Sequence, residues 1–452
     1  MAFTLSLDDF VISHFTSGST FQTLPILIYS MTKRRVRLDI YALSTVIFLA
    51  VLVLLVLNNF AKGSDISKHG QKKKQTVVPK LCRVTSVVLV LVLSASVIAF
   101  SRYAGRAAEP LIKLRGEYTR ELAGTELNVF NWGEYISNGL DDSLDINAEF
   151  EKITGIKVNY VTYESNESMY SKMKGGGVSY DIIIPSDYMI ARMANEGMLK
   201  KFNPESLSNY KYIDDKYKNV YFDKNNEYSV PYSVGMVGII YDKTVVSEQD
   251  AKSWNVMWNE KYKSAGILNF NNPRDAFATA QFLCGIDINT TDKKQLDTAA
   301  EKLKQQKKVI QSYVMDEVFD KMESGEAAVA PYYAGDYLSM YENNENLGFA
   351  YPQEGTNIFV DSICIPNSTQ NFEAAKMYIN FLMEPEVALA NAEYICYASP
   401  NTEVVKMEDY TYHDSEILYP NENDRPKTEY FHNLDDETRQ YMDRLWEEVK
   451  LS

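Results

Sequence analysis

The sequence predicts an α/β protein made of two lobes with a cleft between them, preceded by transmembrane helices. Short strand-like and helix-like segments alternate from residue 127 onward, which is typical of βαβ units and a largely parallel sheet. Two long β-like runs, residues 228–241 and 349–366, interrupt this alternation without a helix and indicate places where the chain crosses between lobes. Two long apolar segments lie upstream, near the start of the chain.

The apolar segments, residues 41–58 and 84–100, each approach the length that spans a bilayer. Residues 61–83 between them hold seven Lys and Arg, which favours a cytoplasmic loop and therefore an extracellular chain after residue 100. This orientation would place the basic cluster at residues 33–37 outside the cell, against the usual preference, but that cluster has four Lys and Arg and the loop has seven. We expect residues 101–124, which are also rich in Arg and Lys, to form a membrane-proximal stalk.

Ordered domain structure should begin near residue 126. Before the first crossing we expect strands at 127–132, 157–163 and 181–185 and helices at 144–153 and 168–174. Between the crossings we expect helices at 254–262, 273–284, 292–307, 317–322 and 337–342 and strands at 265–270, 309–314 and 327–332. The tail should be helical at 372–383, 385–394 and 435–449.

Charge is distributed unevenly along the chain. Residues 1–124 hold 16 Lys and Arg against 7 Asp and Glu, whereas the remainder holds 30 against 54. An acidic domain of this kind repels nucleic acid and anionic membrane and raises the local concentration of small cations. The same acidity could serve only to keep the domain in solution, so charge alone leaves both interpretations open.

The sequence lacks the motifs of common catalytic and metal-binding sites. It has no P-loop, Rossmann glycine motif, HExxH, GxSxG or EF-hand pattern, and its four histidines are scattered. The four cysteines have no CxxC or metal-ligand spacing, so we expect no cofactor, no metal and no disulfide framework. Paired carboxylates leave a glycosidase open as an alternative, but a binding protein explains facing acids and aromatics at least as well.

One pattern recurs where apolar runs end: an acid or amide stands within a few residues of an aromatic. The run 353–366 places Asp361 beside Phe359, and the same pairing occurs at residues 131–135, 185–188 and 332–337. In open α/β sheets, ligands bind at the carboxyl ends of the strands. Aromatic faces and carboxylates both attract ammonium groups, so such a cleft is suited to a slim organic polycation.

At these residues the chain resembles the spermidine/putrescine-binding proteins of polyamine ABC transporters. The similarity runs from about residue 127 to 449 through NWGEY, TYESNESMYSKMK, YDIIIPSDYM, GTNIFVDSICIP, YINFLMEPEVA and AEYICYASPN. It implies a periplasmic-binding-protein-like (type II) fold, with lobe 1 at about 125–232 and 367–400, lobe 2 at about 240–355 and C-terminal helices at 401–452. Residues 1–60 are similar to the C-terminal end of the permease subunit, which implies a permease and binding-protein fusion that lacks the upstream permease part.

In that family the ligand lies between the lobes, stacked on aromatics and with its nitrogens on carboxylates. Matched motif by motif, the resemblance implies a set of ligand-binding residues: Trp132, Tyr135, Ser186, Tyr188, Asn272, Asp275, Tyr333, Phe359, Asp361 and Tyr397. Three further acids are candidates for the same site, and each could equally be a solvated acid on the surface: Glu134, Asp187 and Asp336.

The match departs from the family pattern on both sides of Arg274. Asn272 stands where the family can carry an acid, and at the second place the acid is the shorter Asp275. One negative charge fewer leaves less to hold a third ammonium, so we expect putrescine to bind at least as well as spermidine. A glutamine that the family can use late in the chain has no match near residues 430–432.

The resulting expectation is a multi-pass protein of the cell membrane whose extracellular, periplasmic-type domain captures putrescine or spermidine for import. Its expected partners are the permease subunits of an ABC transporter and, through them, the ATPase, with no nucleic acid. A ligand-sensing receptor module and a binding protein for another small organic cation are the alternatives. We expect no enzymatic activity.

Overall fold

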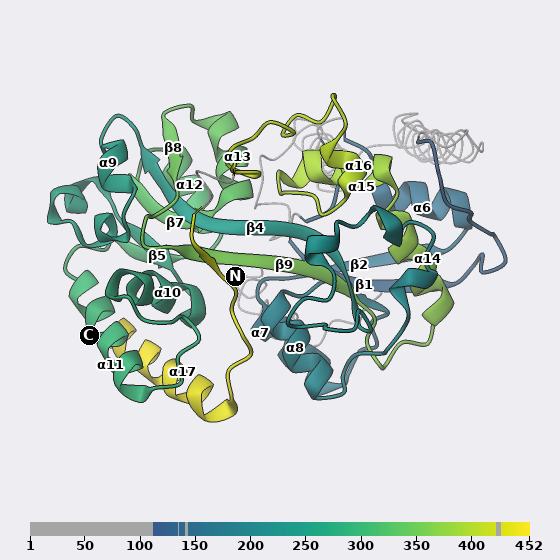
Figure 1. The fold of residues 1–452 in the computed structure, drawn as a ribbon, viewed down its shortest axis with the longest axis horizontal. Coiled ribbons are helices and arrows are strands. Elements are labelled where there is room, and N and C mark those ends of the chain that lie inside the picture. The colour runs from purple at the N-terminus through teal and green to yellow at the C-terminus, as the bar shows by residue number, and fades with distance from the viewer. Residues whose placement is uncertain (1–111, 134, 141–142, 422–425) are drawn as a thin grey trace, which may run out of the picture. The chain divides into compact units, whose positions relative to one another are not determined.

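The computed structural model describes residues 112–452, with gaps at 134, 141–142 and 422–425. This part of the chain folds into two lobes (Figure 1), as the sequence predicts. Lobe 1 is built around β1 (Glu126–Trp132), β2 (Lys157–Tyr163) and β3 (Ile182–Ile183). Lobe 2 is built around β5 (Leu268–Phe270), β6 (Ser312–Val314), β7 (Val329–Tyr333) and β8 (Leu347–Ala350).

The two predicted transmembrane segments, residues 41–58 and 84–100, lie outside the described residues. Within the part of the chain that the structure describes, no helix has both the length and the apolar character needed to cross a bilayer.

One eight-stranded sheet runs through both lobes in the order β2-β1-β3-β9-β4-β7, with β10 (Thr428–Glu429) beside β9 and β8 beside β4. β1 pairs in parallel with β2 and β3, and β5 pairs in parallel with β6. The crossing strands β4 (Ser229–Asp242) and β9 (Thr356–Cys364) are antiparallel to each other and join the lobes (Figure 1). A site on these strands therefore has one lobe on either side.

The second predicted crossing, residues 349–366, consists of two strands and not one. β8 pairs with the lobe 2 end of β4, whereas β9 starts after a turn and pairs with the rest of β4. The turn contains Gly355, whose φ of 116° favours glycine. Because apolar residues continue on both sides of this short turn, the sequence pattern alone did not separate the two strands.

Capping side chains mark the start of several helices of lobe 1. Asp145 accepts the N–H of Ala148, and Ser165 forms a capping box with Ser168. The helices are α6 (Ile146–Thr154), α7 (Asn166–Gly175), α8 (Asp187–Asn195), α14 (Phe372–Leu382), α15 (Pro385–Ile395) and α16 (Thr402–Val405), and 3-10 turns lie at Pro204–Ser206, Tyr210–Tyr212 and Asp215–Tyr217.

Lobe 2 departs from the prediction at residues 254–262, which were expected to form one helix. Two 3-10 turns, Trp254–Trp258 and Glu260–Ala265, replace it because the side chain of Asn259 caps a new start. The remaining helices are α9 (Glu248–Ala251), α10 (Pro273–Cys284), α11 (Lys293–Gln306), α12 (Glu317–Glu323), α13 (Ala334–Asn343) and α17 (Asp436–Leu451).

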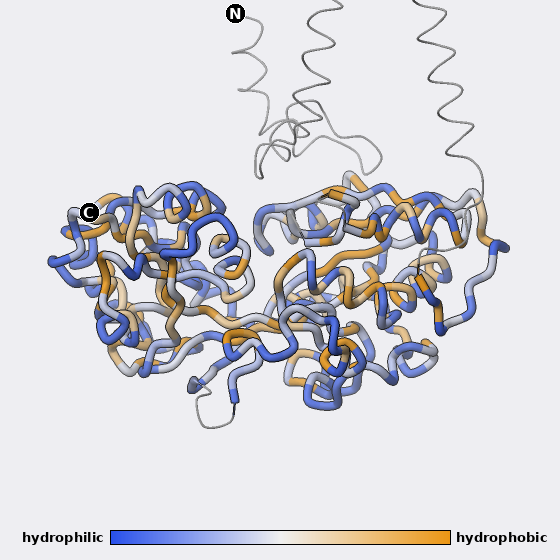
Figure 2. Tube along the Cα trace, turned by 90° about the horizontal axis from the view of Figure 1, so that it is seen from above, coloured by the Kyte–Doolittle hydropathy of each residue, from blue (hydrophilic) through white to orange (hydrophobic). Residues whose placement is uncertain are grey.

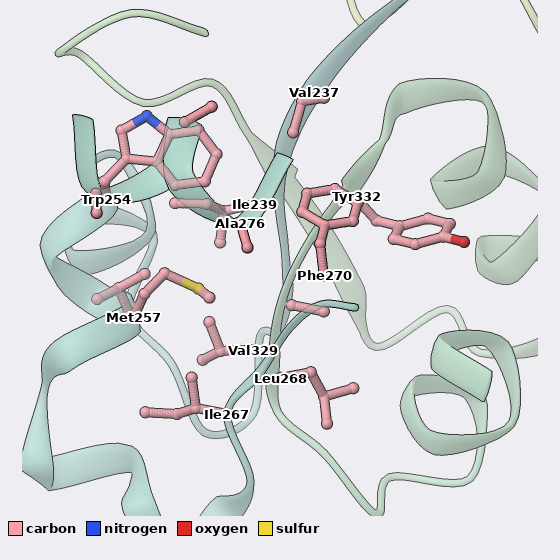
Figure 3. Packing of buried hydrophobic residues seen from close by; sticks show 14 of the residues in the cluster. Val237, Ile239, Trp254, Met257, Ile267, Leu268, Phe270, Ala276, Val329 and Tyr332 are labelled. Atoms are coloured by element: carbon pink, nitrogen blue, oxygen red, sulfur yellow. The ribbon is translucent and has the colours of Figure 1, made fainter. Parts of the chain in front are cut away.

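Each lobe has its own apolar core, and hydrophobic segments of the chain run through the interior of both lobes (Figure 2). In lobe 2, Trp254 and Met257 cluster with residues of the central strands such as Ile239 (Figure 3). The C-terminal helix α17 adds Trp446 and Val449 to this core. In lobe 1 the sheet buries both faces, because neighbouring residues of β1 belong to two different clusters.

Residues 113–118 lie on lobe 1, within the segment that the sequence suggested as a stalk. The backbone N–H groups of Arg115 and Gly116 donate to the carboxylate of Glu384, at 2.8 and 2.6 Å. The hydroxyl of Tyr118 donates to the same carboxylate at 2.7 Å. Glu384 is fully buried, so these residues form a strap held by hydrogen bonds at the start of α15.

Candidate ligand-binding site

Asp361 is the buried acid of the crossing strand β9, and only 4% of it is exposed. Its Oδ2 accepts a hydrogen bond from the hydroxyl of Tyr135 at 2.7 Å, whereas Oδ1 has no hydrogen-bond partner among the described residues. Burial raises the pKa of Asp361 to about 6, although the hydroxyls of Ser186 and Tyr135 oppose the shift. A buried carboxylate oxygen without a donor is a place for a cation or a hydrogen-bond donor from outside.

Tyr135 is held between both crossing strands. Its hydroxyl contacts the hydroxyl of Ser233 on β4 as well as Asp361 on β9. Its backbone carbonyl accepts from the hydroxyl of Tyr232 at 2.6 Å, and its ring lies edge-on to Tyr397 with centroids 5.4 Å apart. The ring is therefore fixed, and its hydroxyl orients the carboxylate.

Rings from different parts of the chain line the same place. The ring of Phe359 lies 5.4 Å from that of Tyr333 and 6.3 Å from that of Tyr397, measured between centroids. Gly235 faces Phe359 and Gly335 faces Tyr397, and a Cβ at either glycine would collide with the ring. The rings of Phe359 and Tyr397 can pack in these positions because Gly235 and Gly335 have no side chain.

Lobe 1 contributes the start of α8 and its neighbours. Ser186, the residue before α8, forms an isolated bridge with Asp361. The amide of Asn166 donates to the hydroxyls of Ser186 and Tyr188, at 3.1 and 3.2 Å. The hydroxyl of Tyr188 donates to Glu167 at 2.9 Å.

Trp132 also comes from lobe 1, at the end of β1. Its indole N–H donates to the carbonyl of Ile184 at 2.9 Å, and its ring lies 4.8 Å from that of Tyr163. The indole N–H is thus engaged inside the lobe, and Trp132 can offer a ligand only its ring.

Lobe 2 contributes the start of α10. Asn272 caps this helix by accepting the N–H of Asp275, and its amide donates to the Asp275 carboxylate at 2.7 Å. The hydroxyl of Tyr333 donates to the same oxygen at 3.1 Å. Burial raises the pKa of Asp275 above its usual range, and the bonds from Asn272 and Tyr333 oppose this. Both polar atoms of the Asn272 side chain are therefore engaged within lobe 2, the oxygen in capping α10 and the nitrogen in the bond to Asp275.

The three further acidic candidates are placed differently. Asp187 is 1% exposed, and its carboxylate accepts the N–H groups of Tyr188 and Val360, so it is an internal acid of lobe 1. Asp336 is half-buried on α13, and its charge helps to raise the pKa of Tyr397. Glu134 lies outside the described residues.

Sequence reasoning missed several groups at this site: Asn166, Glu167, Tyr232, Ser233, Arg274 and Phe431. Ser233 and Tyr232 lie in the run that we used only to recognise a crossing strand. Ser233 pairs with Asp361 across the two strands and so shares its face, but the irregularity of the ladder between Pro231 and Ser233 interrupts the period-two alternation that could have indicated this. Within the described residues no group of His, Cys, Asp and Glu is arranged to hold a metal ion.

Comparisons with known proteins identify the family of this chain. Residues 145–417 match the family model described as bacterial extracellular solute-binding protein. The chain is 33% identical over 316 residues to the spermidine/putrescine-binding periplasmic protein of Salmonella typhimurium, which covers 70% of this chain and 89% of the relative. It is 26% identical over 342 residues to the putrescine-binding periplasmic protein PotF of Escherichia coli, with 72% and 91% covered.

Among solved structures, the chain is similar to the spermidine/putrescine ABC transporter substrate-binding protein PotD of Streptococcus pneumoniae. The TM-score is 0.63 at 31% identity, and the match covers 72% of this chain and 99% of that one. Members of this family bind solutes for transporters and are not enzymes. The chain therefore belongs to the bacterial extracellular solute-binding proteins.

Proposed function

We propose that this chain captures polyamines, putrescine or spermidine, outside the cell and delivers them to the permease and ATPase of an ABC transporter. The relatives named above support this proposal, since the name of the first states that it binds spermidine and putrescine and that of the second states that it binds putrescine. So do the rings and carboxylates that the described residues bring together between the lobes.

The observation that carries the proposal is that Asp361 Oδ1 is buried and has no hydrogen-bond partner in the part of the chain that the structure describes. Leaving a buried acceptor unpaired costs about 1–3 kcal/mol, more for a charged group. An ammonium group would supply both the hydrogen bond and the positive charge, and aromatic faces such as that of Phe359 attract the same group. In this proposal Asp361 binds one end of the ligand, and the residues matched to the family motifs surround the rest.

The proposal is tested by calorimetric titration of putrescine and spermidine into the full chain purified in detergent. We expect a dissociation constant of about 1 μM or below, which corresponds to a binding free energy of about −8 kcal/mol or more favourable. In Asp361→Asn we expect the binding free energy to weaken by at least about 1.5 kcal/mol, because the hydrogen bond between the ammonium group and the charged carboxylate is removed. Asp409→Asn, at an exposed surface position, makes the same charge change and should bind like the parent.

Two results would count against the proposal. Folded protein that gives no heat with either ligand would exclude polyamines and would call for a screen of other organic cations and sugars. Equal binding by the parent and by Asp361→Asn would show that the ligand lies elsewhere.

We further propose that residues 41–58 and 84–100 tether the domain to its membrane, and that residues 1–60 derive from a permease subunit. Apolar length and the basic loop at residues 61–83 support the tether. Tethering would raise the effective concentration of the domain at the permease. Protease added to intact spheroplasts should release the domain from the membrane fraction; a domain cleaved only after lysis would place it on the opposite side.

A further inference from the structure

A β-bulge in the crossing strand β4 decides which side chain stands opposite Asp361. β4 pairs with β9 as far as Pro231 and again from Ser233, so Tyr232 is one extra residue on β4. Ser233 is thereby paired directly with Asp361, and paired residues of an antiparallel ladder have their side chains on the same face. If the register at Pro231 continued, Tyr232 would stand there instead. The bulge therefore puts a small hydroxyl side chain beside the buried carboxylate.

Tyr135 is held by both residues of the bulge. Tyr232 donates its hydroxyl to the backbone carbonyl of Tyr135 at 2.6 Å and accepts from the amide of Asn391 at 2.9 Å. The hydroxyl of Ser233 contacts the hydroxyl of Tyr135, which donates to Asp361 Oδ2 at 2.7 Å. Ser233 is 1% exposed and Asp361 is 4% exposed, so this chain of hydroxyl groups is shielded from solvent.

The direction of these bonds follows from the charge of Asp361. A charged carboxylate can only accept, and Tyr135 has a single hydroxyl hydrogen. While Asp361 is charged, that hydrogen points to Oδ2, so Ser233 must donate its own hydrogen to the oxygen of Tyr135. A donor on the phenol oxygen polarises the phenol and strengthens its bond to the carboxylate. When Asp361 is protonated the chain can run the other way, but its bonds then join neutral groups and are weaker.

We infer that Ser233 is a positioning residue for ligand capture, which acts through Tyr135 to keep Asp361 charged and ready to bind an ammonium group near neutral pH. This rests on the proposed function. Burial disfavours the charge, as the raised pKa of Asp361 shows. A protonated Asp361 must lose its proton before it binds a cation, which weakens binding. The two linked hydroxyl groups oppose that loss of affinity.

Other titratable and polar groups also face Asp361. Ser186, just before α8, has a hydroxyl that lowers the pKa of Asp361. Next to it, burial and the charge of Asp361 raise the pKa of Asp187 well above its usual range. Burial raises the pKa of Tyr163 and Tyr232, so both remain neutral. Because Asp187 can also titrate, the test compares two variants that leave all these groups unchanged.

The test uses Ser233→Thr and Ser233→Val, which have nearly the same shape and differ in the hydroxyl. A cavity of about 20 Å³, lined by Ser233 together with Ala392 and Ile395, gives room for the added methyl group. Putrescine is titrated calorimetrically into the full chain from about pH 5 to pH 8. We expect Ser233→Thr to follow the parent, whereas in Ser233→Val the pH below which affinity falls should rise by at least about 0.5 unit. Circular dichroism checks that both variants fold.

Two further readouts distinguish this role from a merely structural one. The first is the number of protons released per putrescine bound, measured from the heats in buffers of different ionisation enthalpy. Near neutral pH it should be higher for Ser233→Val than for Ser233→Thr, because more of the Asp361 carboxyl is protonated. The second is a Tyr135→Phe background, in which the two substitutions should give the same pH profile because the hydroxyl through which Ser233 acts is gone.

The outcomes separate this inference from the function on which it rests. Putrescine affinity that is lower in Ser233→Val by the same factor at every pH, or that follows the parent throughout, would overturn the role of Ser233 and leave polyamine capture standing. A difference between the two substitutions that persists in the Tyr135→Phe background would also overturn it. Parent protein that binds neither putrescine nor spermidine would overturn polyamine capture, and the inference with it.

Discussion

At the scale of single residues, Asp361 combines features that favour ligand binding at the expense of stability. It is buried, one carboxylate oxygen has no partner among the described residues, and its pKa is about 6. An unfolded aspartate has a pKa of about 3.9. The folded protein therefore holds a proton more tightly, and between these values its stability falls as the pH rises.

This predicts that Asp361→Asn stabilises the ligand-free protein at about pH 8, by roughly 1–3 kcal/mol, because the uncompensated charge is gone. Near pH 4 the parent carboxyl is protonated in the folded state, so the difference between the two proteins should shrink. Urea unfolding of the domain at both pH values measures this. A variant less stable than the parent at about pH 8 would mean that the carboxylate is stabilising.

Ligand binding should depend on pH through the same group. An ammonium ion prefers the charged carboxylate, so below about pH 6 the protein must first lose a proton to bind. We expect putrescine affinity to decrease by up to about tenfold per pH unit below that point and to level off above it. Titrations from about pH 5 to pH 8 test this, and an affinity independent of pH over that range would remove Asp361 from the ligand contact.

The sequence could single out Asp361 and Tyr135, which the structure brings into hydrogen-bond contact, because each stands in a short, continuous motif. It could not predict the setting of Arg274, because the residues that hold it, Asn289 and Phe431, are far from it and from each other in the chain. Such contacts depend on how separate segments meet, and one sequence carries no direct signal of that.

At the scale of elements, the strap of residues 113–118 shows what the pattern of apolar residues leaves out. The sequence suggested a stalk, since the segment is basic and has no strand or helix period. In the structure Glu384 accepts bonds from Arg115, Gly116 and Tyr118, and also from Asn209 at 2.9 Å. In the sequence, an acid just before a helix suggests only a helix cap. The four groups that donate to Glu384 come from distant parts of the chain, so the sequence gives no sign of them.

We predict that Glu384→Gln destabilises lobe 1 by about 1–3 kcal/mol, because an amide cannot accept all of these bonds and adds donors of its own. Cleavage by trypsin after Arg115 or Arg120 should also become faster. Glu386→Gln is the control, because among the described residues Glu386 accepts one hydrogen bond, from the N–H of Lys113, at an exposed position. If both variants lose stability equally, the strap does not depend on the buried carboxylate.

At the scale of the whole described domain, the order of strands and helices was predictable because the short segments carry their own apolar period and several helices start at a capping side chain. The separate strands β8 and β9 and the 3-10 turns at 254–265 were not, since short turns within apolar runs change the pattern little. The two lobes meet at the crossing strands, so a ligand bound there would contact both lobes and favour their approach.

This arrangement predicts where binding slows hydrogen exchange. Putrescine should protect amides at the starts of α8 and α10, which come from opposite lobes and carry Tyr188 and Asp275. Amides of α11, which packs into the core of lobe 2 and carries none of the proposed ligand residues, should not change. Protection confined to one lobe would mean that the ligand binds without drawing the lobes together.

The most direct test of polyamine capture is an experimental structure of the chain with putrescine bound. We predict one ammonium nitrogen within about 3 Å of Asp361 Oδ1, with the carbon chain against the rings of Phe359 and Tyr333. A structure in which putrescine binds elsewhere, and Oδ1 still has no partner, would contradict the account.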